Sequence, residues 1–186
     1  MHVIPGTPDE IVLPSMKPET EWIRGRAKRK VSPKQSHARI QSRLVVLLDA
    51  WARGRGEVGS EWRFRLAPSP DARRPLVPDV CYVSYERMSG VSREALEAPE
   101  FAPDVAFEIR SPGDNLKDLE EKIRVYRACG AHAVVVIDPL RSLVKVVDEY
   151  GVTFLERDDV FEHPALPGFR LVLADLFSAL DLPQRP

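Results

Sequence analysis

Apolar residues recur at two spacings along this chain, and these spacings predict strands and helices in alternation. Period-two alternation predicts strands over 61–66 and over 104–110, where Val105, Phe107 and Ile109 share one face. The continuous apolar run 133–137 is typical of a central strand buried on both faces. Further strands are expected over 79–83, over 22–31 with a hairpin turn near Gly25, and in a hairpin formed by 143–147 and 152–155.

Helical spacing marks two longer segments. Ser32 is a favourable N-cap and Pro33 fits a first turn, so a helix is expected to begin there, and its buried stripe is Ile40, Leu44, Leu47, Leu48 and Trp51. After a break at 111–114, which also caps the second helix, the buried stripe is predicted to be Leu116, Leu119, Ile123 and Tyr126. Gly130 is expected just after its end. Short helices are expected within 91–99 and over 174–180, the latter after a last strand, and the glycines at 54, 56 and 59 predict a loop.

This order of elements predicts the α/β class, and the composition is that of a globular domain. The chain has 186 residues, of which 44% are hydrophobic and 30% charged, enough to build one core. We expect residues 1–20, which are rich in proline, to form an extended N-terminal arm. Residues 21–186 are expected to form a single domain.

The cysteines and the apolar runs give an expectation about the compartment. Cys81 and Cys129 have neither the spacing of a zinc site nor that of a disulfide scaffold, so both are expected to be reduced. We see no charged-then-apolar leader, and no apolar run is long enough to span a bilayer. A cytoplasmic protein that makes no use of a membrane is therefore expected.

Basic residues are concentrated in one segment, although the formal net charge of the whole chain is only -1. Within 21–43 a single acid, Glu21, is outnumbered by Arg24, Arg26, Lys28, Arg29, Lys30, Lys34, Arg39 and Arg43. In a strand, the alternating Arg24, Arg26, Lys28 and Lys30 would lie on one face. Such a patch can attract a polyanion such as DNA, but a solvated charged face explains it about as well.

Asp79 and Glu108 are the candidate metal ligands. Asp79 begins one predicted strand, and Glu108 lies on the polar face of another near its C-terminal end, so pairing of the strands would bring the carboxylates together. Two close carboxylates stay ionised when a cation lies between them, and Mg²⁺ or Mn²⁺ prefers such oxygen ligands. The simpler alternatives are a turn aspartate after proline for Asp79, and for Glu108 an ion pair with Arg110.

Lys122 is the candidate catalytic cation, 14 positions after Glu108 (122 − 108) on the second predicted helix. It lies at the edge of the helix's buried stripe, so its ammonium can reach the carboxylates. There it would orient or deprotonate an attacking water and stabilise the transition state of phosphodiester hydrolysis. A surface pair with Asp118 is the simpler interpretation, and the spacing alone favours it.

Together these stretches resemble the Uma2-like (DUF820) family of restriction endonucleases, within the PD-(D/E)xK nuclease superfamily. The matching pieces are Pro-Asp-Val at 78–80, Pro-Asp-Val-Ala-Phe-Glu-Ile-Arg-Ser-Pro-Gly-Asp at 103–114, Glu-Lys-Ile-Arg-Val-Tyr-Arg-Ala-Cys-Gly at 121–130 and Val-Ile-Asp-Pro at 136–139. Glu-Trp-Ile-Arg-Gly at 21–25, Ser32-Pro33 with His37, and Leu-Pro-Gly-Phe at 166–169 also match. The resemblance runs from about residue 21 to residue 180.

The resemblance implies a restriction-endonuclease-like central mixed β-sheet flanked by helices, with Asp79 and Glu108 as ligands of Mg²⁺ or Mn²⁺. The superfamily's usual lysine position, two residues after the glutamate, holds Arg110 here, and the resemblance implies that Lys122 on the helix takes its role. Arginine stays protonated, so Arg110 is expected to bind phosphate or to orient Glu108. Arg26 stands where many relatives carry an acid, which argues against an acidic role at this strand. His37 is expected either to line the cleft or to be a buried, satisfied histidine.

The leading hypothesis is a metal-dependent DNA endonuclease, with Asp79, Glu108 and Lys122 as its catalytic residues. Arg110 and His37 would support them, and DNA would be bound by Arg24, Arg26, Lys28 and Lys30. The rival is a nuclease-fold protein with weak or lost catalysis that serves as a nucleic-acid-binding or interaction module. A phosphodiesterase acting on RNA or a small nucleotide is a third possibility. A homo-oligomer, most simply a dimer, is expected because cutting both strands benefits from paired sites.

Overall fold

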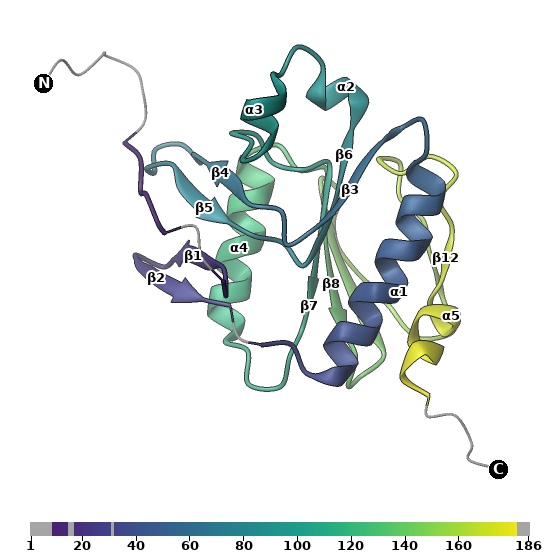
Figure 1. Cartoon of the computed structure of the whole chain (residues 1–186). Helices are drawn as coiled ribbons and strands as arrows, with labels where there is room; N and C mark the ends of the chain where they lie inside the picture. Colours follow the sequence, from purple (N-terminus) through teal and green to yellow (C-terminus); the bar gives the residue numbers. More distant parts are fainter. Residues whose placement is uncertain (1–8, 15–16, 31, 182–186) are drawn as a thin grey trace, which may run out of the picture.

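A six-stranded mixed sheet forms the centre of the computed structural model, which describes residues 9–14, 17–30 and 32–181 (Figure 1). The strands lie in the order β10, β9, β8, β7, β6, β3. Only β7 and β8 pair in parallel; the other neighbours in this sheet are antiparallel. The bounds are β3 Gly56–Ser60, β6 Val80–Ser84, β7 Val105–Ile109, β8 Ala133–Asp138, β9 Leu143–Asp148 and β10 Gly151–Leu155. The predicted α/β class, with a mixed central sheet between helices, is confirmed.

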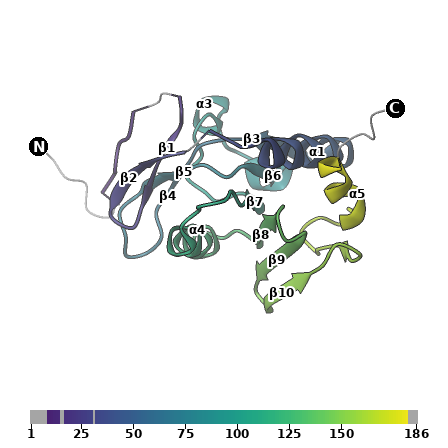
Figure 2. The same cartoon turned by 90° about the horizontal axis from the view of Figure 1, so that it is seen from below.

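Helices α1 (Gln35–Ala52) and α5 (Leu173–Phe177) cover one face of the sheet (Figure 2). The apolar stripe of α1 packs on the side chains that alternate along β7, and the shared core includes Ile40, Leu44, Leu48, Val105, Phe107 and Ile109. This is the burial that the helical and period-two patterns predict. The predicted start of α1 is wrong by a few residues. Its N-cap is Lys34, which has no side-chain cap bond, and Ser32 lies before the helix.

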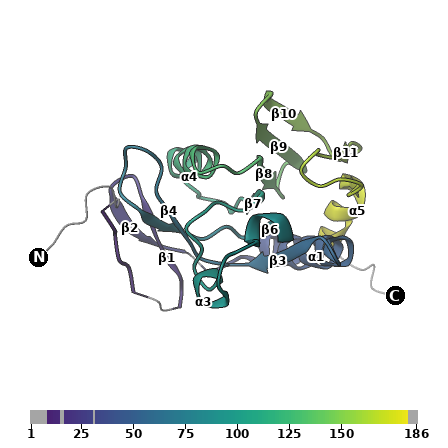
Figure 3. The ribbon, with the colours of Figure 1, turned by 90° about the horizontal axis from the view of Figure 1, so that it is seen from above.

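Helix α4 (Leu116–Ala128) covers the opposite face, together with two small hairpins (Figure 3). The hairpins are β1 (Thr20–Ile23) with β2 (Arg26–Arg29), and β4 (Phe64–Leu66) with β5 (Arg74–Leu76). The turn of the first has Arg24 at φ 50° and Gly25 at φ 74°, as a two-residue hairpin turn requires, so the predicted hairpin is confirmed. This layer encloses the face of β7 that carries Glu108.

The segment after α1 differs from the prediction. Of the glycines expected in a loop, Gly54 does lie in the turn after α1, but Gly56 and Gly59 belong to β3, an edge strand that pairs with β6. A Cβ added at Gly56 would lie 2.2 Å from the carbonyl oxygen of Val83, so the close pairing there requires glycine. Of the predicted strand 61–66 only Phe64–Leu66 is a strand, in a separate hairpin. The reason is Glu61, whose φ of 52° ends the extended conformation of β3.

The ends of α4 match the prediction in part. Its N-cap is Asn115, which accepts a hydrogen bond from the Lys117 N–H, whereas the break at 111–114 closes as a turn before it. Leu116, the first residue of α4, is 55% exposed and does not join the buried stripe. Gly130 follows the C-cap with φ 94°, as predicted.

The remaining elements are short and lie at the ends of the sheet or after it. They are α2 (Tyr85–Met88), α3 (Arg93–Leu96), β11 (Val160–Phe161), β12 (Leu171–Val172) and a 3-10 turn at Ser178–Leu180. Cys81 and Cys129 are both free. Within the described ranges, no helix has the length and apolar character needed to cross a membrane. Part of the predicted arm, residues 1–8 and 15–16, lies outside those ranges, and the division into arm and domain stays a prediction.

Candidate active site

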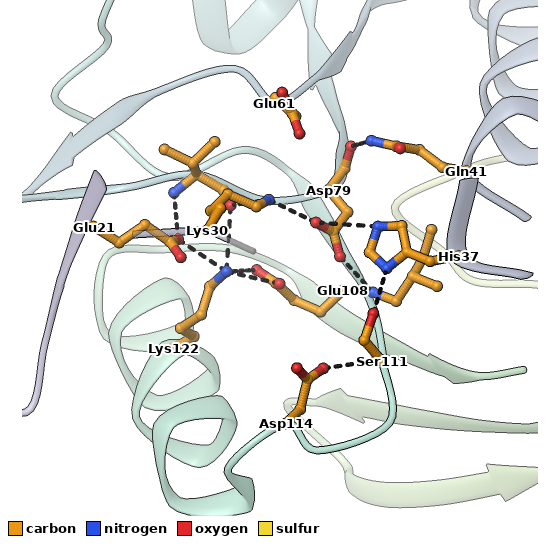
Figure 4. Close-up of polar contacts among 12 residues, drawn as sticks. Glu21, Lys30, His37, Gln41, Glu61, Asp79, Glu108, Ser111, Asp114 and Lys122 are labelled. Carbon is orange, nitrogen blue, oxygen red and sulfur yellow. Dashed lines mark hydrogen bonds and ion pairs between the residues drawn. The ribbon is translucent and has the colours of Figure 1, made fainter. Parts of the chain in front are cut away.

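Antiparallel pairing of β6 with β7 brings Asp79 and Glu108 to one cavity (Figure 4). Val80 pairs with Phe107, so Asp79, just before β6, lies beside the end of β7. The Ile109 N–H donates a hydrogen bond to Asp79 Oδ2 at 2.7 Å, which fixes this carboxylate against the strand. The cavity measures about 290 Å³, and the two acids are only 4% and 6% exposed.

Two side chains of α4 hold the carboxylate of Glu108. The Lys122 Nζ lies 2.6 Å from Oε1 and 2.7 Å from Oε2, and the Tyr126 hydroxyl donates a hydrogen bond to Oε1 at 3.1 Å. Lys122 and Tyr126 are one helical turn apart, so they reach the same point from one face of the helix. A buried carboxylate needs such partners, because an unpaired buried charge costs several kcal/mol.

Lys122 is shared with a second acid, Glu21 of β1. Its Nζ lies 2.9 Å from Glu21 Oε1 and donates a hydrogen bond to the Val77 carbonyl at 3.2 Å. The Val77 N–H in turn donates to Glu21 Oε1 at 2.8 Å, so the backbone of one residue contacts both side chains. With 6% of its surface exposed, Lys122 is not the surface lysine of the simpler interpretation, and its ion-pair partners are Glu108 and Glu21.

Lys30, which follows β2, points into the same cavity. Its Nζ lies 2.6 Å from Asp79 Oδ1 and donates a hydrogen bond to the Val77 carbonyl at 3.1 Å. The side chain is 14% exposed, so Lys30 lies in the cavity and not with the more exposed Arg24, Arg26 and Lys28, while its expected role in DNA binding stays a prediction. The cluster therefore joins three carboxylates, those of Glu21, Asp79 and Glu108, to two ammonium groups.

Burial and the neighbouring charges shift the pKa values of the cluster in different directions. Burial pushes the pKa of Asp79 up, but the ammonium groups of Lys30 and Lys122 outweigh it and hold that pKa below its usual value. Burial raises the pKa of Glu108 to about 7, although Lys122 opposes the rise. Burial also disfavours the charged form of Lys122, yet the carboxylates of Glu108 and Glu21 raise its pKa well above the ordinary value. Lys122 therefore keeps its proton at neutral pH and can serve as a hydrogen-bond donor.

His37 and Gln41, on successive turns of α1, approach Asp79 from the other side. The His37 Nε2 lies 3.7 Å from Asp79 Oδ1, and its Nδ1 is 3.3 Å from the Ser111 hydroxyl oxygen. Gln41 donates a hydrogen bond to the Asp79 carbonyl at 2.9 Å. His37 thus both lines the cavity and is a buried, partnered histidine, which unites the two expectations for it.

Arg110 does not pair with Glu108, which corrects that expectation. Its Nη1 donates a hydrogen bond to Asp138 Oδ2 at 2.6 Å, because Arg110 lies just beyond the end of β7 and beside the last residue of β8. Its backbone N–H donates to the Ile137 carbonyl at 2.8 Å and continues the parallel ladder. Arg110 still lines the cavity, although its ion pair is with Asp138.

Three other basic residues of the first hairpin converge on Asp118 of α4. Lys28, Arg24 and Arg26 place nitrogen atoms 2.7, 3.5 and 3.8 Å from its carboxylate oxygens. Lys28, together with the arginines, holds the pKa of Asp118 below its usual value. The three cations remain 39%, 44% and 61% exposed while Asp118 is buried, so positive charge is in excess at this rim.

The donor set fits a Mg²⁺ or Mn²⁺ ion held by two carboxylates. Asp79 and Glu108 offer hard oxygen donors in a single cavity. Among the described residues, no group of three or more His, Cys, Asp or Glu side chains is arranged to hold a metal alone. Mg²⁺ commonly needs only one or two protein carboxylates, since water and substrate phosphates fill its other positions.

Local sequence patterns do not assign Glu21, Tyr126 or Asp118 to the site, and they assign Lys30 to DNA binding alone. The sequence argues against an acidic role at the strand that includes Glu21, because Arg26 stands where many relatives carry an acid. Helical spacing places Tyr126 in the buried stripe of α4. Its spacing of four from Lys122 is the signal that could place its hydroxyl beside Glu108, the partner of Lys122. Asp118 was considered only as a partner of Lys122, whereas it binds the hairpin.

The fold is that of a nuclease-like α/β domain. The model of the Uma2 family, described as "Putative restriction endonuclease", matches residues 11–174, so the chain belongs to this family. A solved structure, described as a "putative nuclease belonging to DUF820 from Anabaena variabilis ATCC 29413", is similar with a TM-score of 0.80. It shares 24% sequence identity, over 90% of this chain and 94% of that one, which supports the fold alone. No curated protein matches the chain. The predicted family and fold are confirmed.

Proposed function

We propose that this protein is a metal-dependent endonuclease that hydrolyses phosphodiester bonds of DNA. The observation that carries the proposal is the convergence of Asp79, Glu108 and Lys122 in one buried cavity of a nuclease fold. Membership of a family described as restriction endonucleases supports the same reaction class.

The residues would divide the work as follows. Asp79 and Glu108 would hold Mg²⁺ or Mn²⁺. When bound, the metal ion would neutralise charge on the phosphate and lower the pKa of a bound water molecule. Lys122 donates hydrogen bonds, and its fixed positive charge stabilises the negative charge that develops on a phosphate oxygen. Tyr126 and Glu21 position Glu108 and Lys122 through the contacts described above.

The rim of the cavity suits a polyanionic substrate. Arg24, Arg26 and Lys28 are exposed in part and outnumber their single carboxylate partner, so they can turn toward phosphates of a bound strand. Arg110 lines the cavity and would contact a phosphate nearer the reacting bond. Free cysteines suit our further proposal that the protein acts in the cytoplasm.

The proposal predicts cation-dependent cleavage of DNA. Supercoiled plasmid incubated with the protein and Mn²⁺ or Mg²⁺ should become nicked and then linear, and a chelator should abolish this. Parallel assays with single-stranded RNA and a cyclic dinucleotide identify the substrate class. Cleavage that persists in excess chelator would contradict the metal role, and cleavage of RNA alone would replace DNA as the substrate.

The rival function, nucleic-acid binding without catalysis, is favoured by a specific observation. Lys30 and Lys122 already neutralise the two candidate metal ligands. This alternative predicts DNA binding that weakens steeply with salt, no cleavage, and no uptake of Mn²⁺ at millimolar concentrations. Calorimetry with Mn²⁺ therefore separates the two functions.

We also propose that the protein acts as a homodimer, because cutting both strands of a duplex benefits from a two-fold pair of active sites. The expected result is a dimer at micromolar concentration in light scattering. A monomer that still produces linear plasmid in a single encounter would contradict this arrangement.

A further inference from the structure

The two lysines of the cluster are held very differently. Lys122 lies on a regular helix, is 6% exposed, and contacts both Glu108 and Glu21. Lys30 lies beyond the end of β2, and 14% of its side chain is exposed against 7% for Lys122. Among the described residues, its ion pair is with Asp79 alone. Of the two ammonium groups, Lys30 is therefore the one that can leave its carboxylate while the other stays.

The position of Lys30 on Asp79 is the position that a metal would need. The Oδ2 atom of Asp79 accepts the Ile109 N–H and faces the strand. The Oδ1 atom is the one that faces the cavity, and Lys30 Nζ lies 2.6 Å from it. The His37 ring, 3.7 Å away, lies beside the same oxygen. A divalent cation on Oδ1 would be a few ångströms from an ammonium still bound there, and the like charges would repel each other.

We propose that Lys30 is an internal counter-ion that occupies the cation position at Asp79, and that a divalent cation displaces its ammonium. This inference rests on the proposed function in so far as Asp79 is a metal ligand. It assigns Lys30 a role that the DNA-binding expectation for the hairpin did not include.

The hairpin itself need not move for this exchange. Lys28, two residues before Lys30, and the arginines of the hairpin hold the hairpin to Asp118. A lysine side chain has a flexible stem of four carbons, so its ammonium can change position while the strand stays docked. Once displaced, the ammonium remains at the cavity, where it would attract a phosphate group. Cation binding and polyanion binding should then strengthen each other.

Calorimetric titration with Mn²⁺ tests this on three proteins: the unmodified chain, Lys30→Met, and the matched control Lys28→Met. Both variants remove one positive charge from the same hairpin, but only Lys30 contacts Asp79. We expect Lys30→Met to bind Mn²⁺ about tenfold more tightly than the unmodified chain, and Lys28→Met to stay within about twofold. Equal affinities of the unmodified chain and Lys30→Met would overturn the inference. So would an equal gain in both variants, which would mean a general effect of charge.

A second measurement needs no variant and so does not depend on how Lys30→Met folds. The rate at which an amine-reactive reagent labels Lys30 can be followed by mass spectrometry with and without Mn²⁺. Labelling of Lys30 should rise severalfold with Mn²⁺ while that of Lys28 stays constant. An unchanged or lower rate at Lys30, under conditions where Mn²⁺ binds, would overturn the inference.

The failure of the inference and that of the proposed function give different results. If neither the unmodified chain nor Lys30→Met takes up Mn²⁺, Asp79 is not a metal ligand, and both fail together. If both proteins bind Mn²⁺ with one affinity, the metal site stands and only the role of Lys30 is lost.

Discussion

Glu108→Gln is expected to lower the rate of DNA cleavage by about 10³-fold while leaving the fold intact. Glutamine has nearly the shape of glutamate, and its carbonyl can still accept a hydrogen bond from Lys122. It lacks the charge that a divalent cation requires, so the loss should fall on the reaction. Asp79 is the poorer choice for this test, because its Oδ2 also holds the Ile109 N–H and any change there disturbs the pairing of β6 with β7.

Glu61→Gln is the matched control for Glu108→Gln. Glu61 follows β3 near the site, but its carboxylate pairs with Lys17 at 3.1 Å and does not line the cavity (Figure 4). Single-turnover cleavage of plasmid with Mn²⁺ should be unchanged for Glu61→Gln, and thermal unfolding should show both variants folded. If Glu108→Gln cleaves within about tenfold of the unmodified chain, Glu108 is not a metal ligand in the reaction.

The pair Asp79 and Glu108 could be predicted from the sequence because local rules suffice to place it. Period-two alternation assigns Glu108 to the polar face of its strand, and one assumption, that two strands pair, brings Asp79 beside it. Lys122 is a weaker prediction: its place at the edge of the helix stripe allows it to reach the carboxylates, its spacing alone favours a surface pair, and the resemblance to a family supports the catalytic role. The structure supports its placement because α4 lies over the face of β7 that carries Glu108.

Glu21 and Lys30 could not be placed because their positions depend on where a hairpin docks. Alternation along β2 predicts a common face for its basic residues, but not whether that face meets solvent or α4. Docking on α4 directs Lys28 to Asp118 and lets Lys30, beyond the strand end, reach Asp79. The predicted pairing of Arg110 with Glu108 is wrong for a related reason. Its partner is Asp138 of β8, and no local pattern specifies the register of β8 with β7.

The network around Lys122 predicts a large effect on stability that is separate from catalysis. Lys122→Met should lower the free energy of unfolding by about 3–5 kcal/mol, because Glu108 and Glu21 would lose the cation that both contact while remaining buried. Urea unfolding followed by circular dichroism measures this. The control is Lys117→Met, an exposed lysine on the same helix, which should change the free energy by no more than about 0.5 kcal/mol.

A double variant shows whether the loss comes from unpaired charge or from lost packing. Glu108→Gln/Lys122→Met removes one of the two stranded carboxylates, so it should be more stable than Lys122→Met alone by about 1–3 kcal/mol. Packing does not explain such a gain in stability, because the added Glu108→Gln substitution brings no apolar contact. If the losses in the free energy of unfolding of the two single variants simply add, Lys122 stabilises the fold through its aliphatic stem. Its positive charge then has no role in holding Glu108 in place. The double variant also lacks a candidate metal ligand, so it reports on stability alone, and the stability that it does not recover includes the cost of Glu21, which stays buried without its cation.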